Sequence, residues 1–314
     1  VDYDGTASSL LVEPERTNLL PYSSDFTVGN WTKSRCTVTS NQAISPDGTL
    51  NADLMTSTDA DARLEDQVGS SGAEFTQSIY VKSAQASDVD CQIDFAGLNI
   101  QYFTATQEWQ RVETTLTDTG VSPRLRLRIL NSGNSIYVWG GQVEEGSYGT
   151  SYIPTKGEAA GVTRVKDQYS KTGISNLINS EEGVLFLEMA SFVKINPSGN
   201  ITLTDGSGDN RIYIYYLVDN SISVIYNINS TGAAIHNFAL ADITQQTKIA
   251  VKWGDSNVSV WINGNSVLST ATSNFLPNTL NQLDFSKPSG GVPFEGKVKQ
   301  LQIYKTTDID LAAL

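Results

Sequence analysis

The sequence has few of the residues on which many catalytic and metal sites depend. Its 314 residues include two cysteines and one histidine, which gives neither a disulfide framework nor a pattern of zinc ligands. No apolar run reaches the roughly 18 residues of a membrane span, and no basic segment followed by an apolar one marks a signal peptide. The sequence therefore predicts neither membrane insertion nor a zinc site.

Basic residues are also scarce. With 34 acidic and 21 basic residues the formal net charge is −13, so the chain is expected to repel a phosphate backbone or an anionic membrane. Nucleic acid is excluded as an expected partner on this ground. The acidity is compatible with calcium, although scattered carboxylates are more often solvated surface than ligands. No cofactor is predicted, and calcium stays an open alternative.

Short runs of alternating apolar and polar residues dominate the chain, and helical periodicity is absent before the last seven residues. Such alternation is typical of β-strands with one buried face. The runs are 77–82, 91–95, 124–130, 136–143, 184–189, 212–216, 222–226, 249–253 and 258–262. Without crossover helices a parallel sheet is excluded. The predicted fold class is all-β, with two consecutive antiparallel β-sandwich domains of the jelly-roll type.

The length suits two domains, each able to bury its own core. Residues 154–161 combine small, polar and turn residues without periodicity, which is typical of a linker. The predicted organisation is a first jelly roll over 1–155, a linker or bridging segment over 156–180, and a second jelly roll over 181–314. Cys36 and Cys91 lie in strand-like runs, where a small buried thiol is the plain interpretation.

Several segments resemble recurrent parts of bacteriophage tail and appendage proteins. The opening Val1–Gly5 with Ser9–Phe26 is similar to the segment that introduces a carbohydrate-binding-module-like jelly roll in those proteins, and 137–155 is similar to its closing strand. Four stretches resemble a concanavalin-like, laminin-G-like domain: 182–188, 248–253, 258–264 and 294–304. The resemblance implies a virion protein on the surface of an extracellular particle. Because the chain begins with valine inside the recurrent motif, we expect a fragment or a processed product.

An enzyme is not predicted. His236 lies in a strand-like run, and no Gly-x-Ser-x-Gly motif accompanies it. Paired carboxylates can hydrolyse a glycosidic bond, but Glu144 and Glu145 are adjacent on a strand and face opposite sides. Asp88 and Asp90 lie where a loop enters a strand. Polysaccharide degradation is therefore less favoured than sugar binding or a purely structural role.

Sugar binding needs aromatic rings that stack on pyranose rings and polar groups that read hydroxyls. If three strands of the first domain share a sheet, one face carries Tyr80, Lys82, Gln92, Asp94, Arg126 and Arg128. The candidate carbohydrate-binding residues on this face are Tyr80, Asp94 and Arg126. Cross-strand ion pairs between Asp94 and an arginine explain the same pattern without a ligand and are the favoured alternative.

Aromatic side chains also alternate with isoleucine and valine along two predicted strands of the second domain. The candidate carbohydrate-binding residues there are Arg211, Tyr213, Tyr215 and Trp261. Burial of these aromatics by the other domain or by a neighbouring subunit is an equally favoured alternative. Trp253 is in phase with core residues instead. The loop 205–210 has the oxygen-rich composition of a calcium loop, although a simple turn is more usual.

The leading hypothesis is a non-enzymatic virion surface protein that binds bacterial surface polysaccharide. Shallow sugar sites are weak singly, so repetition in a homo-oligomer would raise avidity. Besides the glycan, other virion proteins are the expected partners. The alternative is a purely structural virion spacer or assembly protein, in which the aromatic stripes are buried between subunits.

Overall fold

The computed structural model describes residues 9–69, 74–117, 122–194, 199–286 and 293–313. The recurrent opening motif Val1–Gly5 lies outside these residues. Within the described ranges the chain folds into antiparallel sheets with one short 3-10 helix, Ser175–Leu177, so the predicted all-β fold class is confirmed. The helical turn expected near the end is a simple turn, in which Ala313 N donates to Asp310 O. No helix in the described part is long and apolar enough to cross a membrane.

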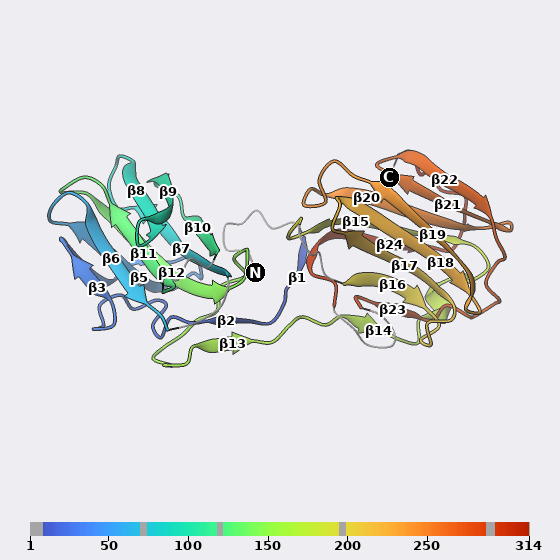
Figure 1. The fold of residues 1–314 in the computed structure, drawn as a ribbon, viewed down its shortest axis with the longest axis horizontal. Coiled ribbons are helices and arrows are strands. Elements are labelled where there is room, and N and C mark those ends of the chain that lie inside the picture. Colours follow the sequence, from blue (N-terminus) through green and yellow to red (C-terminus); the bar gives the residue numbers. More distant parts are fainter. Residues whose placement is uncertain (1–8, 70–73, 118–121, 195–198, 287–292, 314) are drawn as a thin grey trace. The chain divides into compact units, whose positions relative to one another are not determined.

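The chain divides into two compact units, each with its own hydrophobic core. The first unit comprises residues 15–165. The second comprises residues 166–313 together with residues 9–14. Figure 1 shows the strands of both units, coloured along the sequence.

Residues 156–180, for which the sequence predicts a linker, contribute strands to both units. In the first unit, β13 (Val162–Arg164) pairs with β2 (Arg16–Asn18). In the second unit, β14 (Ser170–Lys171) pairs with β23 (Gln282–Asp284). The boundary between the two units lies between these two short strands, after residue 165.

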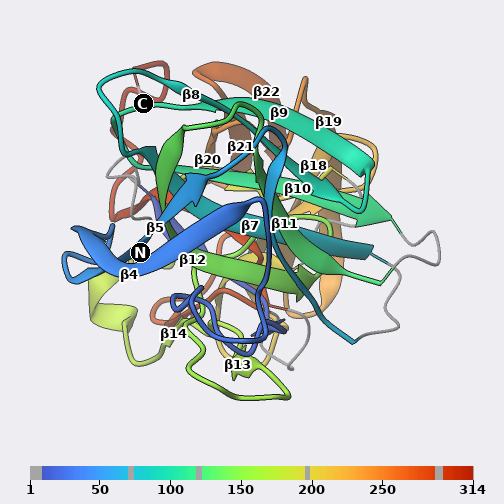
Figure 2. The same ribbon diagram turned by 90° about the vertical axis from the view of Figure 1, so that its left-hand side faces the viewer.

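The first unit is a sandwich of two antiparallel sheets, and Figure 2 looks onto it. One sheet has the order β10 (Gln110–Thr117), β7 (Glu74–Ser83), β12 (Ser135–Glu145), β5 (Leu50–Ser57) and β4 (Cys36–Ile44). The other has the order β3 (Thr32–Ser34), β6 (Ala62–Gln67), β11 (Arg124–Ile129), β8 (Val89–Phe95) and β9 (Leu98–Ala105). Ile79 and Val138 of the first sheet pack with Ile93 and Leu127 of the second in one core.

The second unit is also a sandwich of two sheets. One sheet has the order β1 (Leu10–Val12), β24 (Gly296–Tyr304), β15 (Gly183–Ser191), β20 (Thr247–Gly254), β21 (Asn257–Ile262) and β22 (Asn265–Ala271). The other has the order β14, β23, β16 (Asn200–Thr204), β17 (Arg211–Leu217), β18 (Ser221–Ile228) and β19 (Thr231–Ala239). Leu187, Val251, Ile214 and Val224 meet in the core between the sheets. The core position predicted for Trp253 is confirmed, because its side chain is fully buried.

Strand β1 completes the second unit, although it precedes the first unit in the sequence. It pairs antiparallel with β24, and Val12 is fully buried in the core of the second unit. Figure 1 shows this strand in blue. In topological terms the first unit is therefore an insertion into the second, after the first strand of the latter.

One glycine of the second unit is fixed by its surroundings. Gly199 precedes β16 with φ +71°, and a Cβ atom there would lie 1.9 Å from the carbonyl oxygen of Pro293. Both the left-handed backbone and the close approach require glycine. The backbone that leads into β16 thus lies close to the segment that leads into β24.

Candidate functional site

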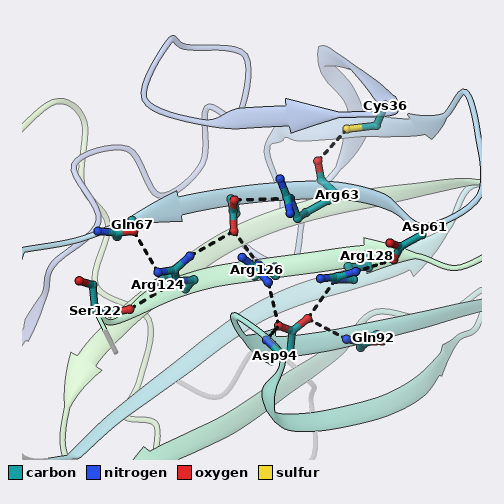
Figure 3. A network of polar contacts seen from close by, with 12 residues as sticks. Cys36, Asp61, Arg63, Gln67, Gln92, Asp94, Ser122, Arg124, Arg126 and Arg128 are labelled. Atoms are coloured by element: carbon teal, nitrogen blue, oxygen red, sulfur yellow. Dashed lines mark hydrogen bonds and ion pairs between the residues drawn. The ribbon is translucent and has the colours of Figure 1, made fainter. Parts of the chain in front are cut away.

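Asp94 is the centre of an ion-pair network on the outer face of the sheet that contains β6, β11 and β8 (Figure 3). Its carboxylate is fully buried and lies between two arginines, with Oδ1 3.3 Å from Arg126 Nη1 and Oδ2 3.1 Å from Arg128 Nε. Gln92 Nε2 donates to Oδ2 at 2.8 Å, and Gly97 N donates to Oδ1 at 2.6 Å. Both carboxylate oxygens of Asp94 are therefore occupied by groups of the protein.

Glu65 pairs with two arginines of β11 from the side opposite to Asp94. Its Oε2 atom lies 2.6 Å from Arg126 Nε and 3.6 Å from Arg124 Nη1. Asp61 lies 2.6 Å from Arg128 Nη1. The three arginines of β11 thus each face a carboxylate, which is the cross-strand ion pairing that the sequence offered as the alternative to a glycan site.

Tyr80 does not join Asp94 and Arg126, and the shared face expected for the three residues is wrong. Strand β7 pairs with β10 and β12, whereas β8 and β11 belong to the opposite sheet of the sandwich. Tyr80 is 2% exposed and its ring lies 5.3 Å from that of Trp139. Arg111 lies over the tyrosine ring at 5.6 Å, an arrangement typical of a cation–π contact.

Strand β17 carries a second set of predicted residues on its outer face. Ile212 and Ile214 point into the core, so Arg211, Tyr213 and Tyr215 face the other way. The rings of Tyr213 and Tyr215 are 4.9 Å apart, and the guanidinium of Arg211 lies 5.4 Å from the centre of the Tyr213 ring. The structure thus brings three of the four predicted residues of the second domain into one row.

The neighbouring strand β18 adds polar groups beside this row. Ser223 is paired in register with Tyr215, and Asn227 with Arg211, so their side chains share the same face. Both residues are buried, and neither Ser223 Oγ nor Asn227 Oδ1 has a hydrogen-bond partner among the described residues. Arg211 Nε is also without one. Among the described residues, these three polar atoms therefore lack a hydrogen bond.

The other flank of the row is satisfied within the protein. Thr202 of β16 is paired in register with Tyr213. Its hydroxyl accepts a hydrogen bond from Asn200 Nδ2 at 2.7 Å and donates to the Ser286 carbonyl at 3.1 Å. Unpartnered polar atoms therefore concentrate on the β17 and β18 side of this face.

The environment keeps the Tyr213 phenol protonated. Burial, with a further contribution from Tyr215 and against the effect of Arg211, raises the pKa of Tyr213 to about 12. At neutral pH the hydroxyl is therefore a neutral group. Together with the ring of Tyr215, the face presents aromatic surface, neutral hydroxyl and amide groups, and one cation.

Trp261 is not part of this face. It lies on β21, in the opposite sheet of the second unit. There it is partly buried against an apolar cluster that includes Phe186, Ala250 and Leu311. Residues near the end of the chain thus cover the outer surface of that sheet, and Trp261 packs beneath them.

The carboxylates considered for catalysis or calcium have structural partners. Glu144 is fully buried and accepts hydrogen bonds from Gln142 and Thr150, whereas Glu145 is exposed. Asp205 Oδ1 accepts from the backbone N–H groups of Ser207 and Gly208. Burial raises the pKa of Asp205, but hydrogen bonds from the side chains of Asn210 and Ser207 and from these two N–H groups lower it overall. Within the described ranges no three His, Cys, Asp or Glu side chains gather as a metal site.

No protein-family model matches the chain, and no curated protein sequence does. Solved structures similar to part of it include the CBM40 module of the Ruminococcus gnavus IT-sialidase bound to α2,3-sialyllactose. That module is 13% identical, and the match covers 47% of this chain and 96% of that chain with a TM-score of 0.37. The CBM22-1 xylan-binding domain of Paenibacillus barcinonensis Xyn10C is 20% identical, covering 44% and 99% with a TM-score of 0.33. A heptameric pentraxin from Limulus polyphemus is 12% identical, covering 43% and 68% with a TM-score of 0.35.

Ser223 and Asn227 are not predicted as site residues from the sequence. A signal for them exists in the run 221–228, where Ser221, Ser223 and Asn227 alternate with apolar residues that enter the core. Polar residues on the outer face of a central strand are common, so the pattern alone does not distinguish them from solvated surface. The burial of Ser223 and Asn227 without hydrogen-bond partners among the described residues does distinguish them from solvated surface.

Proposed function

We propose that this chain is a non-enzymatic carbohydrate-binding protein and that the outer face of β17 and β18 is its binding site. The supporting observation is that Ser223 Oγ and Asn227 Oδ1 are buried without partners beside the ring pair of Tyr213 and Tyr215. Buried polar atoms nearly always have a hydrogen-bond partner, and a glycan supplies hydroxyl groups. Tyrosine rings suit the apolar faces of a pyranose, and Arg211 adds a donor.

We further propose that the glycan is a bacterial surface polysaccharide and that the protein acts on a virion, in a tail or appendage. This setting is supported by the resemblance of Ser9–Phe26 and 137–155 to recurrent segments of phage proteins. A net charge of −13 disfavours nucleic acid as the partner. Repetition of the site in a homo-oligomer would strengthen weak binding to a repeating polymer.

The test is binding of the full chain to an array of bacterial capsular and surface polysaccharides, followed by calorimetric titration of the best ligand. Ser223→Ala removes a hydroxyl that has no partner in the protein, so thermal stability should be unchanged while affinity falls about fivefold, the value of one hydrogen bond. Tyr215→Ala should weaken binding about tenfold through the lost stacking surface. Tyr102→Ala, at a 68% exposed tyrosine of the first unit, serves as the control and should bind normally.

Two results would overturn the proposal. If Ser223→Ala and Tyr215→Ala bind the best glycan as tightly as the wild type, the face of β17 and β18 is not the site. If no polysaccharide on the array binds, the protein is not a carbohydrate-binding protein, and the structural spacer becomes the better description.

A further inference from the structure

A pocket of about 330 Å³ lies in the second unit, at the edge where β17 begins and β18 ends. It is lined by Asn210, Ile228, Asn229, Thr272, Ser273, Asn274, Leu276 and Thr279. No lining residue is charged. The volume is at the lower end of the range of about 300 to 1,000 Å³ that is typical of small-molecule sites, so the pocket suits one ring-sized group.

One wall of the pocket is held by the loop that the sequence marks as oxygen-rich. Asn210 Nδ2 donates to Asp205 Oδ2 at 2.8 Å, and Asn210 Oδ1 accepts from Asn229 N at 3.0 Å. Ser230 N donates to the carbonyl oxygen of Asp209 at 3.0 Å. These bonds fix the turn between β18 and β19 without using the side-chain amide of Asn229.

The segment that follows β22 forms the other wall, and it is anchored to the core. Tyr226 donates its hydroxyl to the Ser273 carbonyl at 3.3 Å, and its ring packs 4.7 Å from that of Phe275. Asn274 Oδ1 accepts from Ser256 N at 2.9 Å, which leaves its amide N–H groups unused. Both walls are therefore positioned before any ligand arrives, and pre-formed sites bind at a lower entropic cost.

The groups left for a ligand are neutral. The side-chain amide of Asn229 and the hydroxyls of Thr272 and Thr279 make no hydrogen bond to any described residue. Leu276 is 69% exposed at the pocket and offers an apolar surface beside them. An anionic ligand would find no cation in the lining, and the Asp205 carboxylate, which a metal would need, is engaged by its own loop.

We propose that this pocket binds a neutral pyranose unit. Amide and hydroxyl groups read the ring hydroxyls, and Leu276 contacts the apolar edge of the ring. The pocket shares no residue with the face formed by Tyr213, Tyr215 and Ser223, so it is a second site, which rests on the proposed carbohydrate-binding function and can be probed separately from the first.

The experiment is an amide NMR titration of the full chain with the methyl glycosides of glucose, galactose and mannose, and with methyl glucuronide as a charged comparison. At least one neutral glycoside should shift the backbone amides of Asn229 and Thr279. Thr279→Val, which removes a hydroxyl at nearly constant volume, should weaken this binding about fivefold. Leu276→Ser should weaken it by a similar factor.

One control variant separates this site from general effects. Val218→Ser changes another exposed apolar residue of the same unit, 66% exposed, and should leave binding unchanged. The proposal fails if no neutral glycoside shifts the pocket amides, or if glucuronide binds more tightly than all of them. It also fails if Thr279→Val and Leu276→Ser bind as the wild type does.

Discussion

Asp66 is a buried carboxyl group that forms no ion pair with any residue that the structure describes. It follows Leu64 on the core side of β6, where it is paired with Leu125 and is 7% exposed. Its Oδ2 atom has no hydrogen-bond partner among the described residues. Burial raises the pKa of Asp66 to about 6, against a smaller effect of the Gln67 backbone N–H group. Compared with the unfolded chain, the folded first unit therefore favours the protonated form of Asp66.

The resulting loss of stability can be estimated from this pKa. An aspartate in an unfolded chain has a pKa of about 3.9, and each pKa unit is worth about 1.4 kcal/mol. A folded pKa of about 6 thus corresponds to roughly 3 kcal/mol. Because the folded pKa is raised, this stability is present below about pH 4 and is lost as the pH rises to about 6. Above that pH the loss is constant.

Asp66→Asn removes the titration. The variant should therefore be more stable than the wild type. The difference between their unfolding free energies should be about 2 to 3 kcal/mol larger at about pH 8 than at about pH 4. Urea unfolding followed by hydrogen exchange in peptides over 62–67 and 124–129 reports on the first unit alone. Glu108→Gln, at an exposed carboxyl of the same unit, should show no such difference. An Asp66→Asn gain that is the same at both pH values would refute the reasoning.

Two further substitutions test the packing of each unit. Asp94→Asn should lower the unfolding free energy of the first unit by about 3 kcal/mol in urea, because Arg126 and Arg128 lose the carboxylate between them; a loss below about 1 kcal/mol would contradict this. Gly199→Ala should lower the unfolding free energy of the second unit by at least about 2 kcal/mol, measured by thermal unfolding. Gly173→Ala is the matched control, since φ is +70° but nothing lies near its Cβ position, and equal losses would show that the contact with Pro293 is not the cause.

The sequence predicted local features well because strand alternation is local. The alternation of 212–216 places Tyr213 and Tyr215 opposite the core, and this prediction is confirmed. Sheet membership depends on pairing between distant strands, which is why Tyr80 was grouped wrongly with Asp94. Similarly, Trp261 packs against a cluster that includes Leu311, an arrangement that alternation within 258–262 does not indicate.

From the sequence alone, ion pairs and internal hydrogen bonds could be predicted only as alternatives to a ligand site. The pattern of β11 allowed both a glycan site and ion pairs for Arg126, and the choice depended on whether β6 brings Glu65 alongside it. Likewise, the composition of 205–210 fits calcium or a turn. Only the observed hydrogen bonds of Asp205 to its own loop assign these oxygens.

The position of β1 has a consequence for how the protein is made. Leu10–Val12 leaves the ribosome before the whole first unit, yet its partner strand β24 comes after every other described strand of the second unit. The first unit can fold during translation, as domains generally do, whereas the sheet that contains β1 cannot close until β24 has been synthesised. Until then β1 has no partner and one edge of β15 is unpaired, and an unpaired strand edge attracts strands of other chains. A fragment that starts after residue 165 would leave the β1-facing edge of β24 unpaired permanently, so recombinant production of the second unit needs residues 9–14 supplied as well.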